Sequence, residues 1–229
     1  MKTVVLGMLV LGLVGRMAAS DVNSLTEDEA REGWRLLFDG SSLDGWRGFK
    51  SERPDKNWRV EDGALVLRGK AGDLVTQEAF GDFELTLEWK VAEGANSGVI
   101  YRVGLGEANT FTTGPEYQVL DNVKAHDNHP ASHRAGALYD LEGIEEDVTR
   151  PVGEWNQARI VVSGWRVQHW LNGRQIVDVD LASPAGKALI AASKFKHWEK
   201  FASLARGHLA LQDHGDVVSY RAIKLRELK

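Results

Sequence analysis

Apolar and polar residues alternate in short runs along most of this chain. In the clearest run, Phe83, Leu85, Leu87, Trp89 and Val91 alternate with polar residues, and this period of two predicts a strand with one buried face. Similar runs predict further strands over Trp58–Val60, Ala64–Arg68, Gly98–Val103, Glu116–Leu120, Asn156–Val162, Arg166–Leu171, Gln175–Asp180, Gly207–Gln212 and Val217–Leu225. Strands at this close spacing, without the strand–helix rhythm of α/β folds, predict an all-β fold of two packed antiparallel sheets.

A two-residue turn connects two of these runs. Asn172-Gly173 follows one run and precedes the next, and both residue types tolerate positive φ, so the pair predicts a β-hairpin. The segments with little strand signal are Gly104–Pro115, Asp121–Gly136 and Ala182–Arg206. Loops of this length on a sandwich are often functional.

One short helix is predicted near the start of the chain, over residues 24–33. A capping box can form from Ser24 with Glu27 or from Thr26 with Glu29, while Gly33 can end the helix. No second helix is predicted.

The first twenty residues have the pattern of a secretory signal peptide. Lys2 precedes an apolar run over Val4–Gly15, and Ala18-Ala19-Ser20 provides small residues for cleavage after Ala19 or Ser20. The run is too short to span a membrane, although Arg16 leaves an uncleaved signal anchor as an alternative. We therefore expect residues 1–20 to be a signal peptide and residues 21–229 to form a single domain. The mature protein is then exported, periplasmic or secreted, and has no contact with the membrane after cleavage.

Composition excludes several classes of function. The chain has 28 Lys and Arg against 33 Asp and Glu, a net charge of -5, which disfavours nucleic acid as a partner. It has no cysteine, so disulfides, thiolate metal sites and a cysteine nucleophile are excluded.

Polar residues inside predicted strands mark a candidate site. The alternation in 116–120 places Glu116 and Gln118 on one face, and the alternation in 98–103 places Arg102 on the face of Ile100. Such side chains, gathered on one sheet face, would suit a polar ligand such as a sugar. The alternative is a solvated outer face with an Arg–Glu pair.

The seven histidines suggest different roles. His214 lies between Asp213 and Gly215 at a strand end, where a turn can aim its imidazole out of the sheet, or form no more than an ordinary turn. The segment 126–129 together with His133 could ligate a metal, but the spacing matches no established template. His169 alternates with apolar residues and is predicted to be a buried histidine with its hydrogen bonds satisfied.

The eight tryptophans include candidate sugar platforms. Trp89 is predicted to lie in the core because of its place in the alternation. Trp170 and Trp198 are the candidates for stacking against a sugar ring.

Taken in order, several segments resemble the 3-keto-disaccharide hydrolase family, first described as a bacterial domain of unknown function. The resemblance spans roughly residues 33–228, and it rests on Leu37-Phe38-Asp39-Gly40, Leu43-Asp44-Gly45-Trp46, Gly81-Asp82-Phe83-Glu84-Leu85, Leu87-Glu88-Trp89-Lys90, Asn96-Ser97-Gly98-Val99, Glu116-Tyr117-Gln118-Val119-Leu120-Asp121-Asn122, Ala135-Gly136-Ala137-Leu138-Tyr139-Asp140, Gly153-Glu154-Trp155-Asn156, His169-Trp170-Leu171-Asn172-Gly173 and Gly207-His208-Leu209-Ala210-Leu211-Gln212-Asp213-His214-Gly215.

The resemblance implies a concanavalin A-like jelly roll with a cleft on one sheet, and an exported enzyme that acts on oxidised sugars. Members are associated with cleaving glycosides whose sugar carries a ketone at carbon 3, by hydrolysis or by elimination and rehydration. The ketone acidifies the hydrogen on carbon 2, so the chemistry needs a base, a stabiliser of the enolate oxygen and an acid for the leaving oxygen.

Roles follow from the resemblance, position by position. Glu116 or His214 is implied as the base, and Tyr139 or the other member of that pair as the acid. Arg102 is implied to stabilise the developing charge, with Asn96 or Gln118 beside it.

Three loop residues complete the implied site, and they are Asp121, His133 and Lys194. A divalent metal on the enolate oxygen is left open. The expected partner is therefore a small oxidised glycoside. The alternative function is a non-catalytic carbohydrate-binding module that uses Trp170 and Trp198.

Overall fold

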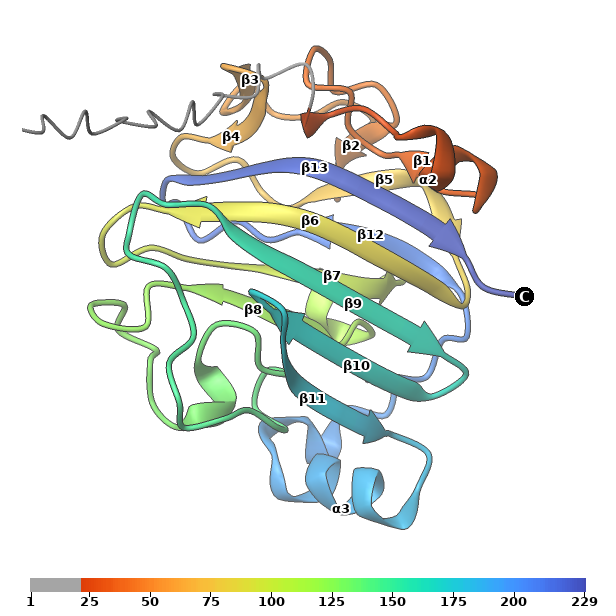
Figure 1. Ribbon diagram of the computed structural model, residues 1–229. Coiled ribbons are helices and arrows are strands. Elements are labelled where there is room, and N and C mark those ends of the chain that lie inside the picture. Colours follow the sequence, from red (N-terminus) through yellow and green to blue (C-terminus); the bar gives the residue numbers. More distant parts are fainter. Residues whose placement is uncertain (1–21) are drawn as a thin grey trace, which may run out of the picture.

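Two antiparallel β-sheets pack face to face in the computed structural model, which describes residues 22–229 (Figure 1). The eight-stranded sheet has the order β11-β10-β9-β6-β13-β4-β3, with β1 paired to β13. The five-stranded sheet has the order β2-β5-β12-β7-β8. The predicted all-β sandwich is confirmed, while the predicted signal peptide over residues 1–20 lies outside the described residues.

The chain crosses repeatedly between the two sheets, with β3-β4, β7-β8 and β9-β10-β11 as consecutive strands of one sheet. Their bounds are β1 (Arg35–Leu36), β2 (Trp46–Gly48), β3 (Trp58–Glu61), β4 (Ala64–Leu67), β5 (Leu74–Phe80), β6 (Phe83–Val91), β7 (Asn96–Val103), β8 (Glu116–Leu120), β9 (Asn156–Ser163), β10 (Arg166–Leu171), β11 (Arg174–Asp180), β12 (Gly207–Leu211) and β13 (Val218–Glu227). The helices are α2 (Glu27–Arg31), α3 (Pro184–Ala192) and the 3₁₀ turns η1 (Thr110–Thr112), η2 (Ala131–His133) and η3 (Lys194–His197).

The period of two in the sequence positions the core between the sheets. In β6, Phe83, Leu85, Leu87 and Trp89 are buried, as their alternation predicts. Apolar side chains of the smaller sheet, among them Tyr117 of β8, meet them from the other side. Burial of this continuous apolar layer is the main stabilising contribution to the fold.

The local turn and cap signals are also found in the structure. Thr26 and Glu29 form the capping box of α2, which selects one of the two predicted alternatives. Asn172 and Gly173 have φ values of 50° and 83° between β10 and β11, and so form the predicted hairpin turn.

The prediction of a single helix was wrong, and three strands were not predicted. Helix α3 begins after Ser183, whose side chain accepts the N–H of Gly186, and Pro184 occupies its first turn. It lies beyond β11 at one side of the sandwich (Figure 1). The strands β1, β2 and β5 were missed because the first two are very short and β5 carries an irregularity that breaks its alternation.

The outward face of the five-stranded sheet is partly covered by loops. Ile100 and Val103 of β7 form a small apolar cluster there with Phe49, and Leu105 and Phe111 from the 104–115 loop pack on it. This loop leaves part of the sheet face open beside it. None of the described helices is long and apolar enough to span a membrane.

Candidate functional site

A cavity of about 200 Å³ opens on the outward face of the five-stranded sheet. It is lined by Asn96, Phe111, Gly114, Glu116, Gln118, Asp127, Tyr139, Lys194, Phe195, Gln212 and His214. These residues come from β7, β8, the end of β12 and three loops, so the sheet forms the floor and the loops form the walls. Glu116, His214, Tyr139, Asn96, Gln118 and Lys194 were predicted as site residues, and the fold brings all six to this cavity.

The floor of the cavity depends on a glycine. Gly98 of β7 pairs with Gln118 of β8, and the side chain of Glu116 folds across it. A Cβ placed on Gly98 would lie 2.7 Å from Cδ of Glu116, and closer still to one carboxyl oxygen. Only glycine leaves room for the carboxyl group in this position.

The carboxyl group of Glu116 is buried without an ion-pair partner among the described residues. The residue is 7% exposed, and its carboxyl accepts no hydrogen bond from another described group. Burial raises the pKa of Glu116 to about 8, an effect that the positive charge of Lys194 opposes and the negative charges of Asp73 and Asp127 reinforce. This carboxyl therefore carries a proton at neutral pH.

Two amides flank the carboxyl group. Oε1 of Gln118 accepts the main-chain N–H of Val119 at 3.0 Å, which leaves its side-chain NH₂ for the cavity. Oδ1 of Asn96 is buried and has no hydrogen-bond partner among the described residues. The NH₂ group of Gln118 is therefore the donor that a bound ligand can use, while the Oδ1 atom of Asn96 is enclosed by protein.

His214 stands exposed at the rim, held by its neighbours along the chain. Its Nε2 lies 2.9 Å from Oε1 of Gln212, and a carbonyl oxygen can only accept, so Nε2 donates. In the neutral imidazole Nδ1 then carries the lone pair. The carboxylate of Asp213 accepts N–H groups of Gly215 and Gly72, which fixes the turn that carries the ring.

A polar network builds the wall opposite. The hydroxyl of Tyr139 donates to Oδ2 of Asp127 at 2.6 Å, and His133 contacts Asp127 through Nδ1 at 2.7 Å and Asp140 through Nε2 at 2.9 Å. Burial, followed by the bond to Asp127, raises the pKa of Tyr139. His133 thus holds Asp127 and Asp140 in place without itself lining the cavity.

Lys194 and two aromatic rings close the cavity. Nζ of Lys194 lies 4.0 Å from the centre of the Tyr139 ring, and its main-chain N–H donates to Asp140. Phe111 and Phe195 form the apolar part of the lining. Trp198 packs on both rings from behind, at 5.8 Å and 5.2 Å between ring centres, and is not itself part of the lining.

Arg102 does not reach the cavity. One extra residue in β7 between Ile100 and Val103 breaks the alternation, since these two residues pair with Ala210 and His208, which are only two positions apart. Arg102 takes φ of 55° in this bulge, and its guanidinium pairs with Asp82 at 2.9 Å. The shared face expected for Arg102 and Ile100 is therefore wrong.

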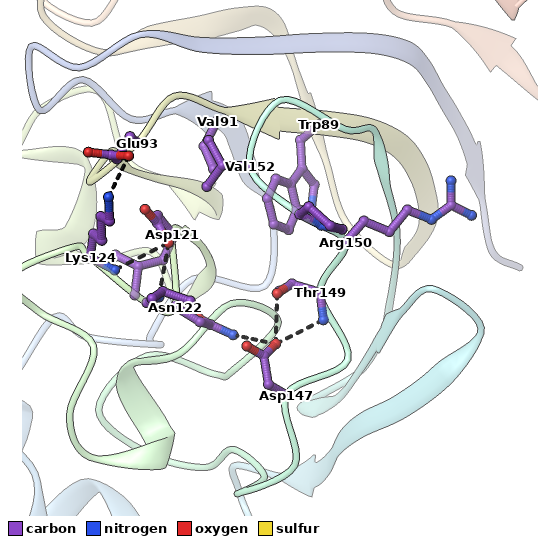
Figure 2. Close-up of a pocket in the computed structure, with 13 residues that line it drawn as sticks. Trp89, Val91, Glu93, Asp121, Asn122, Lys124, Asp147, Thr149, Arg150 and Val152 are labelled. Carbon is purple, nitrogen blue, oxygen red and sulfur yellow. Dashed lines mark hydrogen bonds and ion pairs between the residues drawn. The ribbon is translucent and has the colours of Figure 1, made fainter.

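Asp121 and Trp170 also lie away from the cavity. Asp121 lines a separate hollow of about 470 Å³ beside Asn122 and Lys124 (Figure 2), where its carboxylate accepts the N–H groups of Gly94 and Val123. Trp170 lies on the eight-stranded sheet with the Arg159 guanidinium 4.1 Å from its ring centre. The two tryptophans considered as sugar platforms thus belong to different regions, and neither lines the cavity.

One further histidine, His169 of β10, lies in the core. His169 is buried as predicted, with Nδ1 at 3.1 Å from the Gly136 oxygen and Nε2 at 3.2 Å from the Tyr101 hydroxyl. Burial lowers the pKa of His169 to about 4. Within residues 22–229, no three His, Cys, Asp or Glu side chains are grouped to hold a metal ion, so the metal considered for 126–133 stays a prediction.

Sequence reasoning missed several lining residues. Asp127 was considered only as a metal ligand, although it accepts the hydroxyl of Tyr139. Gln212 lies two positions before His214 at the end of a strand, and this spacing could have predicted that both side chains lie on the same face. Phe111 and Phe195 lie in segments with no periodicity, so no pattern pointed to them.

Comparison with known proteins agrees with this geometry. The family model for a 3-keto-alpha-glucoside-1,2-lyase-like domain matches residues 33–226. A 3-keto-disaccharide hydrolase of Bacteroides thetaiotaomicron is 32% identical over 251 aligned positions, which cover 93% of this chain and 84% of the relative.

Solved structures extend the likeness to three dimensions. A candidate glycosyl hydrolase of Parabacteroides distasonis has a TM-score of 0.85 and 31% identity, covering 90% of this chain and 99% of the other. A carbohydrate-binding module of Bacillus subtilis shares the fold alone, with a TM-score of 0.51 and 10% identity over 80% of this chain and 96% of the module. The chain therefore belongs to the 3-keto-disaccharide hydrolase family.

Proposed function

We propose that the protein cleaves the glycosidic bond of 3-keto-glycosides, with His214 as the base and Glu116 as the acid. The observation that carries the proposal is the buried carboxyl of Glu116, which opens on the same cavity as the imidazole of His214. The relative in Bacteroides thetaiotaomicron is a 3-keto-disaccharide hydrolase by name, which supports the substrate class. The predicted signal peptide favours action outside the cytoplasm.

The chemistry begins at the carbon next to the ketone. The base takes the hydrogen of carbon 2 as a proton, and the electron pair of that bond forms an enolate whose charge lies on the oxygen of carbon 3. The enolate then re-forms the ketone and breaks the bond between carbon 1 and the glycosidic oxygen, and that oxygen takes a proton from the acid. The products are a free alcohol and a 3-keto-sugar with a double bond between carbons 1 and 2, and water added across that bond gives net hydrolysis.

The environments of the two groups decide their roles. Glu116 keeps its proton at neutral pH because its pKa is raised to about 8, so it suits protonation of the leaving oxygen. With Nε2 of His214 held by Gln212, a lone pair on Nδ1 suits removal of the proton from carbon 2. Lys194 and the side-chain NH₂ of Gln118 line the same cavity and can stabilise the enolate oxygen, the role that the resemblance gave to Arg102.

Two substrates with different leaving groups test these roles. With a 3-keto-disaccharide, Glu116→Gln should lower kcat/KM by about 10²- to 10³-fold, because an alkoxide leaves poorly without a proton. With 4-nitrophenyl 3-keto-glucoside the same variant should lose less than about tenfold, because nitrophenolate needs no acid. His214→Asn should lose activity equally on both substrates, while His129→Asn, an exposed histidine outside the cavity, serves as the matched control.

The pH profile provides a second reading of the same assignment. The kcat/KM of the wild type for the disaccharide should fall as the pH rises through about 8, because Glu116 then loses its proton. Glu116→Gln should lack this fall. If the wild type turned over neither substrate, the proposed function would be refuted. If Glu116→Gln lost the same factor in kcat/KM on both substrates, the role of Glu116 as acid would be refuted.

A further inference from the structure

Another hollow, distinct from the one that Asp121 lines, lies beside the candidate site and is larger than it. Its volume is about 560 Å³, and Lys50, Arg53, Lys56, Asp73 and Asn109 are among its lining residues. We call this hollow the basic groove. By contrast the catalytic cavity, at about 200 Å³, is smaller than the roughly 300 Å³ at which pockets for drug-sized ligands begin. A glycoside with one sugar ring in the cavity therefore needs room for its leaving group elsewhere.

The cavity and the basic groove share a wall. Asn109 lines the groove and Phe111 lines the cavity, while the hydroxyl of Thr110 between them donates to Asp73 at 2.5 Å. Asp73 also accepts the main-chain N–H of Asp213 at 2.9 Å, next to His214. One face of this partition thus contacts the catalytic cavity, and the other contacts the groove.

The charge of the groove is dominated by cations. Arg53 and Lys56 have no carboxylate partner among the described residues, and the ammonium of Lys50 contacts only the main-chain oxygen of Glu107 and the ring of Phe49. Of the two acids in the lining, Asp55 is engaged by the N–H of Asn57 at 2.9 Å. Asp73 is half-buried, burial raises its pKa, and its carboxylate accepts the hydroxyl of Thr110 and the main-chain N–H of Asp213.

From the shared wall and the unpaired cations, we infer that the basic groove binds an anionic leaving group, such as a sugar that carries a carboxylate or a sulfate. The inference rests on the proposed function for the orientation of the substrate. Guanidinium and ammonium groups bind carboxylates and sulfates through charge-assisted hydrogen bonds. An acidic protein would otherwise repel such a substrate, so a local cluster of cations is needed to attract it.

The test compares two substrates that differ in one charge. One is a 3-keto-glucosyl glucuronate and the other is its methyl ester. At low ionic strength the kcat/KM of the wild type should be about tenfold higher for the acid than for the ester, and this ratio should fall toward one in about 1 M salt. In the double variant Arg53→Gln, Lys56→Gln the ratio should also fall toward one, while Lys187→Gln, an exposed lysine on α3, should keep it.

Failure of this inference is distinguishable from failure of the proposed function. Equal turnover of acid and ester, insensitive to salt, would overturn the groove as an anion site and leave the proposed function standing. If neither substrate is turned over, the corresponding glucosyl glucuronate and its methyl ester, without the ketone, are titrated into the protein and their binding is measured by calorimetry. Tighter binding of the acid, lost in the double variant, would then support the groove, and equal binding of both would overturn it.

Discussion

Glu116 and Gly98 function as a pair at the scale of single residues. The carboxyl group occupies the space that a side chain at Gly98 would take, and burial there keeps its proton at neutral pH. The alternation of polar residues in β8 predicted that Glu116 belongs to the site. The alternation in β7 did not predict that position 98 must be a glycine, whose lack of a side chain leaves room for the Glu116 carboxyl. The position of the carboxyl therefore depends on the missing Cβ at residue 98, which strand propensities do not predict.

Replacement of Gly98 by alanine should misplace the carboxyl while the sheet remains intact. A Cβ would lie 2.7 Å from Cδ of Glu116, so the side chain has to move by about 1 Å. We expect kcat/KM on a 3-keto-disaccharide to fall about 10²-fold, with an unchanged circular dichroism spectrum. Gly106→Ala is the matched control, because nothing lies within 4 Å of a Cβ at that position. Full activity in Gly98→Ala would contradict the close approach.

The buried carboxyl should also make stability depend on pH. An unfolded glutamate ionises near pH 4.5, whereas the pKa of folded Glu116 is about 8. Between these values the folded state holds a proton that the unfolded state has lost, so the free energy of unfolding falls as the pH rises.

Glu116→Gln has no such titration. Urea unfolding at about pH 5 and about pH 9 should show the wild type losing roughly 2–4 kcal/mol relative to this variant. Glu145→Gln, whose carboxylate is largely exposed, should show no such difference. If the wild type and Glu116→Gln change in parallel, the carboxyl is ionised at neutral pH and cannot be the acid.

At the scale of elements, the sequence predicts correctly which face of a strand each side chain lies on, where apolar and polar residues alternate regularly. β6, β8 and β10 have their predicted faces because each keeps a period of two over its length. Bulges are the exception, because a single extra residue reverses every assignment beyond it. The bulge in β7 turned Arg102 away from the cavity, toward Asp82.

The same cause hid β5. Two positions of β12, His208 and Ala210, pair with Ala79 and Val75, so β5 carries extra residues around Thr76. The hydroxyl of Thr76 accepts the N–H of Leu209 and keeps the strands joined there. Helix α3 was not predicted for another reason. It has only nine residues, and Ser183, Pro184 and Gly186 at its start are residue types that are also typical of turns.

At the scale of the whole molecule, loops that are far apart in sequence assemble the wall of the site. Asp127, His133 and Asp140 lie in the connection between β8 and β9, and Lys194, at the start of η3, follows Asp140 by 54 positions. The contacts of His133 with Asp127 and Asp140, and the bond from the Lys194 N–H to Asp140, each end on a side chain, so sequence patterns could predict the residue types but not the contacts. The sheet fixes the floor, and this network fixes the wall.

His133 is the residue on which the wall depends, because its two ring nitrogens contact Asp127 and Asp140 at 2.7 Å and 2.9 Å. In His133→Ala both carboxylates lose this partner, at a cost of about 1–3 kcal/mol, which would lower Tm by about 5 °C. Amide hydrogen exchange should become faster in residues 126–140 and also in residues 193–198, which His133 does not touch but Asp140 joins through the N–H of Lys194. His129→Ala changes an exposed histidine of the same loop and should leave both segments as they are. Faster exchange confined to 126–140 would show that the two loops are held independently, and that the wall is not a single unit.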